Sequence, residues 1–282
     1  MAVPLFFIIS GYFSFPVKDD TFTFLKKRLT RIVFSLLVWL FLYTLCFSKP
    51  NMMVYDFFNS VQAPQLWYLY ALVGLALLIP LTSGFICNAS KKELQLYIAI
   101  WGLTLIFNGN FFDSFLVIET NHNGLLFTNP ISALLSFYGY FGYLLLGYYF
   151  GKFNINKRTV YGLLSIGCII ILVQYFVLDV AIDRIIAYCS LGNVFISSSI
   201  FLWVKETFKV IVVSDKVYNV VCKMGELTFG IYLTHWLLFQ FLYKIPGSGS
   251  WNCIVTSIVV FGLSAIVTYL ISFVSFKKYV IG

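Results

Sequence analysis

Long apolar runs separated by short polar loops fill almost all of this 282-residue chain. Nine runs are present, with approximate limits at 2–15, 32–47, 66–86, 94–112, 131–150, 160–178, 185–204, 225–243 and 252–276. A helix needs about 20 mainly apolar residues, with a range of about 17–25, to cross the hydrocarbon core of a bilayer. Most of the runs meet this length. Because they are continuous rather than alternating, they exclude the strands of a membrane barrel.

The composition agrees with this interpretation. Hydrophobic residues make up 60% of the chain and charged residues 11%, whereas a soluble domain has about 45–50% apolar and about 25% charged residues. A water-soluble core of this size could not hide so much apolar surface. We therefore predict an all-α, polytopic integral membrane bundle of about nine transmembrane helices, folded as a single domain over residues 1–282.

The basic residues are distributed unevenly between alternate loops. Sixteen of the 19 Lys and Arg residues lie in one set of loops, and only Lys49, Arg184 and Lys244 lie in the other set. Cytoplasmic loops are enriched in Lys and Arg, so the pattern predicts a cytoplasmic C-terminus in the inner membrane of the cell. It also explains the net charge of +8 without nucleic acid. The basic loops are expected to contact the lipid bilayer.

His235 is the main candidate for a functional polar group inside the membrane. It follows Glu226 by nine residues, which is about 13.5 Å along a helix and places it near mid-membrane. A histidine there can accept a proton or hydrogen-bond a sugar hydroxyl, or it can simply be satisfied by a neighbouring helix. The six cysteines form no CxxC pair, so we expect no metal site. We also expect no bound cofactor.

Arg28 and Arg31 form a second candidate site at the inner mouth of the 32–47 run. Residues three apart share one helix face, and two guanidinium groups on one face can bind phosphates in a forked geometry. Basic residues at a cytoplasmic helix end also satisfy the topology rule, so both interpretations stay open on these grounds. Glycines at 139, 142, 147 and 151 are expected to allow close helix packing.

Five stretches, taken together, resemble acyltransferase family 3, whose membrane proteins acylate cell-surface glycans. They are VPLFFIISGY at 3–12, KRLTRI at 27–32, LWYLYAL at 66–72, GYLLLGY at 142–148 and FGIYLTH at 229–235. Their order and spacing match the family over essentially the whole chain. The likeness is closest to the group of the enterobacterial common antigen O-acetyltransferase.

This resemblance implies a ten-helix core with acetyl-CoA as a co-substrate that binds from the cytoplasm, beside Arg28 and Arg31. It implies an acceptor hydroxyl, on a surface polysaccharide or lipid-linked glycan, at the outer side. Two departures stand out. The family's first helix carries an Arg and the usual catalytic His, which would lie upstream of Met1, and Gln65 occupies a position that is often His.

The 2–15 run is too short to span a bilayer, so we expect a further helix before Met1 and no activity without it, with His235 the next candidate base. The predicted function is a membrane O-acyltransferase, in which a His deprotonates the acceptor hydroxyl for attack on the thioester. Two alternatives are a transporter or flippase of lipid-linked sugars and a truncated, non-catalytic membrane protein.

Overall fold

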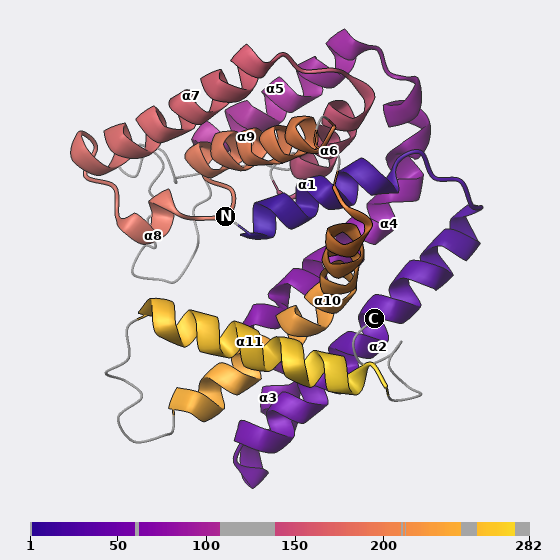
Figure 1. Ribbon diagram of the computed structural model, residues 1–282, viewed down its shortest axis with the longest axis vertical. Coiled ribbons are helices and arrows are strands. Elements are labelled where there is room, and N and C mark those ends of the chain that lie inside the picture. Colours follow the sequence, from indigo (N-terminus) through magenta and orange to yellow (C-terminus); the bar gives the residue numbers. More distant parts are fainter. Residues whose placement is uncertain are drawn as a thin grey trace, which may run out of the picture. The chain divides into compact units, whose positions relative to one another are not determined.

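The computed structural model describes residues 2–59, 62–107, 139–209, 211, 213–243 and 253–273, and all regular elements in these ranges are helical (Figure 1). The predictions for 108–112, for the 113–130 loop, for 131–138 and for the basic residues after 273 lie outside the described residues. The longer helices are α1 (Ala2–Ser14), α2 (Thr21–Phe47), α4 (Trp67–Asn88), α5 (Lys91–Phe107), α6 (Phe141–Lys152), α7 (Lys157–Phe176), α9 (Leu191–Phe208), α10 (Asp215–Tyr243) and α11 (Cys253–Ile271). The short elements are η1 (Pro50–Met52), α3 (Met53–Asn59), η2 (Pro64–Leu66) and α8 (Ile182–Ile185).

Each of the nine apolar runs overlaps one of the longer helices, which confirms the all-α fold class. Four helical segments are long and apolar enough to cross a membrane, judged by length and composition among the described residues: Thr21–Phe47, Pro50–Asn88, Lys157–Phe176 and Cys253–Ile271. The number of nine spans stays a prediction.

Several helix boundaries differ from the runs, because apolarity locates the buried part of a helix and not its polar first turns. Helix α2 begins at Thr21 rather than at 32, and α10 begins at Asp215 rather than at 225. The Asp20 carboxylate caps α2 by accepting the Thr23 N–H at 2.9 Å. Hydrogen bonds from the Thr23 side chain and then its backbone lower the pKa of Asp20.

The chain folds as two compact units, and α4 passes from one to the other. The first comprises Met1–Lys18 and Leu78–Val212, and here α1 packs along α6 while α7 packs along α9. The α1–α6 contact is backbone to backbone, since a Cβ placed on Gly147 would lie 2.0 Å from the Ile8 carbonyl oxygen, and one on Gly11 would lie 2.2 Å from that of Leu144. The predicted role of Gly147 in close packing is confirmed.

Two lysines of the first unit close helix ends. Lys152 Nζ donates to the carbonyl oxygens of Cys87 at 3.0 Å and Ala89 at 3.3 Å, where α4 ends. Lys205 Nζ donates to the Phe150 carbonyl oxygen in the last turn of α6. The last carbonyl oxygens of a helix lack intrahelical donors, and the ammonium groups of these lysines provide the missing hydrogen bonds.

The second unit comprises Asp19–Leu77 and Val213–Gly282, and its main contacts join α10 to α11 and α2 to α3. It holds all three residues for which the sequence predicts a function. That the two units form a single domain, as the short loops indicate, stays a prediction.

Candidate active site

The predicted site residue His235 stands at one end of an aromatic row on α10. Phe229, Tyr232 and His235 follow one another at three-residue spacing, so they lie on neighbouring turns of one helix face. The ring centroids are 6.5 Å apart for Phe229 and Tyr232 and 5.8 Å apart for Tyr232 and His235. Tyr68 of α4 packs edge-on against Tyr232, with centroids 5.5 Å apart.

The two predicted arginines lie near the other end of this row. The guanidinium of Arg31 lies over the Phe229 ring, 5.6 Å from its centroid. Arg28 lies over the Phe24 ring at 5.7 Å and is close enough to Arg31 and Tyr68 to interact with them electrostatically. The structure therefore brings both arginines and His235 into one unit. Phe229, the ring that Arg31 contacts, is six residues from His235, or about 9 Å along α10.

The position of the arginines within α2 differs from the prediction. Because α2 begins at Thr21, Arg28 and Arg31 lie about two and three turns inside the helix and not at its mouth. Their three-residue spacing on one helical face is confirmed. Arg28 is half-buried, whereas Arg31 is exposed, so Arg31 is the more accessible of the two to a phosphate.

The hydrogen bonding of His235 fixes which ring nitrogen can act as a base. Its Nδ1 lies 2.6 Å from the Tyr232 carbonyl oxygen. A carbonyl oxygen only accepts, so Nδ1 carries the proton, and in the neutral ring Nε2 keeps its lone pair. The side chain is half-buried. A backbone contact of this kind holds the ring in one orientation with Nε2 as the proton acceptor.

Tyr43 of α2 is a site residue that the sequence analysis missed. Its side chain is fully buried, and its hydroxyl accepts the Leu237 N–H and donates to the Leu233 carbonyl oxygen, both at 2.9 Å. An undisturbed helix joins these two backbone groups directly. The hydroxyl is thus inserted into the α10 ladder at the turn that carries His235. The chain has 19 tyrosines, and nothing in the sequence around Tyr43 distinguishes it from the others.

Gln65 also contributes to this part of the unit. Its backbone carbonyl oxygen accepts the Tyr232 hydroxyl, which connects η2, just before α4, to the aromatic row. The side chain lies beside the Tyr43 hydroxyl, but neither amide atom has a partner at hydrogen-bond geometry among the described residues. Such a buried amide can pair with a group that both donates and accepts, as a hydroxyl does.

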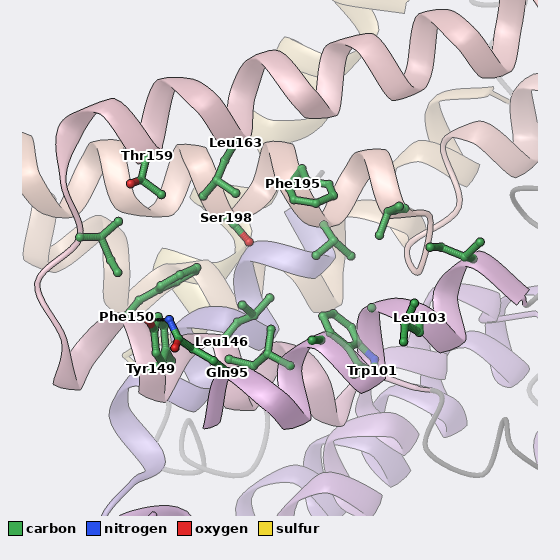
Figure 2. A pocket seen from close by; sticks show the side chains of 17 residues that line it. Gln95, Trp101, Leu103, Leu146, Tyr149, Phe150, Thr159, Leu163, Phe195 and Ser198 are labelled. Carbon is green, nitrogen blue, oxygen red and sulfur yellow. Dashed lines mark hydrogen bonds between the residues drawn. The ribbon is translucent and has the colours of Figure 1, made fainter. Parts of the chain in front are cut away.

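The first unit contains a separate cavity of about 570 Å³ (Figure 2). Residues of α5, α6, α7 and α9 line it, and most of them are apolar. None of Arg28, Arg31 and His235 is among them. Within the described part of the chain, no three His, Cys, Asp or Glu side chains gather as a metal site.

The comparison with known families supports the predicted acyltransferase. The model of a family described as an acyltransferase domain matches residues 1–277, which is nearly the whole chain. The chain belongs to acyltransferase family 3. Membership in this family, together with the apolar helices, makes the protein a multi-pass membrane acyltransferase. Searches of curated proteins and of solved structures gave no match.

Proposed function

We propose that the protein transfers an acetyl group from acetyl-CoA to a hydroxyl of a surface polysaccharide or lipid-linked glycan in the inner membrane. The observation that carries this proposal is the aromatic row on α10. It runs from the Arg31 guanidinium over Phe229 to the oriented ring of His235. A donor with phosphates at one end and a thioester at the other matches a cationic group and a base at opposite ends of this row.

In the proposed reaction, Arg28 and Arg31 hold the coenzyme A phosphates from the cytoplasmic side, where charged hydrogen bonds to phosphate are strong. His235 Nε2 takes the proton of the acceptor hydroxyl while the oxygen attacks the thioester carbonyl carbon. The carbon–sulfur bond then breaks, the new ester forms, and the coenzyme A thiolate takes the proton back from the imidazolium. The Nδ1 contact with the Tyr232 carbonyl becomes stronger when the ring is charged, so it favours the base role.

Donor binding tests the role of the arginines. Arg31→Ala should weaken acetyl-CoA binding to the purified protein about ten-fold or more, because a hydrogen bond to a charged group contributes about 1.5–3 kcal/mol. Lys26→Ala is the matched control, since Lys26 is an exposed basic residue of the same helix. Unchanged affinity in both Arg28→Ala and Arg31→Ala proteins that insert normally would reject this donor site.

Acyl transfer tests the role of His235. His235→Ala should lower transfer of radiolabelled acetyl groups to the glycan fraction of membranes by about 10²–10⁴-fold and leave donor affinity unchanged. A variant that keeps transfer within a few-fold of the parent would show that His235 is only a packed helix residue and that another group is the base.

A further inference from the structure

The cavity of the first unit is a groove with a polar end and an apolar end. It lies between α5 and α7, and residues of α6 and α9 form its floor. In Figure 2, Gln95, Tyr149 and Thr159 gather at one end, while Trp101 and Leu103 lie at the other. Its volume of about 570 Å³ lies within the range of about 300–1,000 Å³ that ligand pockets occupy.

The groove is open along one side. Ala99 and Leu103 of α5 are exposed, Leu103 by 53%, whereas Ser198 at the floor is only 3% exposed and Trp101 at the apolar end only 1%. From Gln95 to Ile106 the lining extends over eleven residues of α5, or about 16 Å. In a membrane protein, a long apolar groove with an open side is accessible to a hydrocarbon chain of a lipid.

The polar end offers specific hydrogen-bonding groups. Gln95 Nε2 donates to the Tyr149 hydroxyl at 2.8 Å. The Ser198 hydroxyl lines the groove, is buried, and has no hydrogen-bond partner among the described residues. Its neighbour Ser199 donates to the Val160 carbonyl oxygen at 2.8 Å, so Ser198 lies level with the first turn of α7. A buried hydroxyl needs a partner, and an ester carbonyl of a lipid would accept its proton.

Positive charge is concentrated at the same end of the groove. The first turn of α5 contains Lys91 and Lys92, and the first turn of α7 contains Lys157 and Arg158, all of them exposed. They lie within four residues of the lining residues Gln95 and Thr159. Glu93, in the same turn as the lysines, accepts the Ser90 N–H at 2.7 Å as a helix cap. The predicted topology places these turns at the cytoplasmic leaflet, where anionic lipids are enriched.

We propose that this groove binds one acyl chain of an anionic glycerophospholipid. The phosphate lies at the basic first turns of α5 and α7, an ester carbonyl accepts the Ser198 hydroxyl, and the hydrocarbon chain continues toward Trp101 and Leu103. The phosphate, ester and hydrocarbon chain of such a lipid match, in this order, the basic turns, the polar end and the apolar end of the groove.

Photo-crosslinking of the purified full-length protein tests this site. The probe is phosphatidylglycerol with a diazirine in one acyl chain, and the comparison probe is phosphatidylcholine with the same chains. We expect phosphatidylglycerol to label peptides of α5, α7 and α9 preferentially. Lys157→Gln with Arg158→Gln should reduce this labelling by about five-fold per removed charge and leave the phosphatidylcholine labelling unchanged.

A matched pair of glycine variants tests the groove itself. Gly102 lines it, and a Cβ there would meet nothing within 4 Å, which is also true of Gly84 outside the lining. Gly102→Phe should fill the groove and abolish its labelling, and Gly84→Phe should leave it intact.

Equal labelling of the groove by both lipids, or undiminished labelling of Gly102→Phe, would overturn the proposal. So would displacement of the probe by coenzyme A, which would make the groove a donor site. Because the charge variant changes only exposed residues, it decides the question even where Gly102→Phe does not fold.

Discussion

Replacing Tyr43 by Phe removes a single hydroxyl from the middle of the α10 backbone ladder. That hydroxyl bridges the Leu237 N–H and the Leu233 carbonyl oxygen, each at 2.9 Å. The ring itself stays in place, because Tyr43 is fully buried and Phe has the same shape. Any effect of Tyr43→Phe therefore reports the two hydrogen bonds.

The magnitude depends on whether α10 can close its own bond. If Leu237 and Leu233 stay apart, a buried donor and a buried acceptor are left without partners, at about 1–3 kcal/mol each. If they pair directly, one helical bond replaces two bonds to the hydroxyl, and the net loss is about 0.5–1.5 kcal/mol. We expect the free energy of unfolding to fall by about 1–3 kcal/mol, with His235 shifted because the turn around it tightens.

Detergent-induced unfolding measures the stability change, and hydrogen exchange at the Leu237 amide reports the local change. Tyr55→Phe is the control, because Tyr55 is 58% exposed and surface changes usually stay within about 0.5 kcal/mol. The reasoning is refuted if Tyr43→Phe matches this control in stability and leaves exchange at Leu237 unaltered. A loss of acetyl transfer with unchanged donor affinity would further mark Tyr43 as a positioning residue for His235.

Two other predictions follow from the fold and the sequence. A reporter fused after Lys278 should give a cytoplasmic signal, and one in the 113–130 loop an external signal; the reverse result at both sites would contradict the orientation. Gly147→Ala should destabilise the protein by about 1–3 kcal/mol in the same unfolding assay, because its Cβ would lie 2.0 Å from the Ile8 carbonyl oxygen. Gly162→Ala, with nothing within 4 Å of its Cβ, should instead be neutral or stabilising, and equal effects of the two changes would rule out the packing argument.

The sequence predicted the helical class well because long, continuous apolar runs are typical of membrane helices and not of barrel strands. Every run overlapped a helix, and the close approach at Gly147 followed from residue size. Helix starts were predicted poorly, as at Thr21 and Asp215, since polar first turns look like loops when only hydropathy is read. The short helix α3 was missed because it lies between two apolar runs, directly after the turn that begins at Pro50. A segment of this kind reads as a loop in the sequence.

The candidate site was predicted only in part. His235 is a rare polar residue in an apolar run, and Arg28 and Arg31 stand out by their three-residue spacing in a basic segment and by the family resemblance. The role of Tyr43 depends on a contact between residues about 190 positions apart, and no local pattern encodes such a contact. The orientation of the His235 ring is also a tertiary property, even though its partner Tyr232 is only three residues away.

The lysines that close helix ends have a consequence for how the protein is made. Lys152 and Lys205 belong to the basic residues from which the cytoplasmic side is predicted, and basic residues in such loops direct the orientation of nascent helices during insertion. Once α4 and α6 have formed, the same side chains bind the carbonyls at the ends of these helices. With the predicted orientation, one ammonium group acts twice during biogenesis, first as a topological signal and later as a cap. Evolution can relocate such a lysine only if both requirements are met at the new position, so these two sites should be harder to exchange than Lys18 or Lys26.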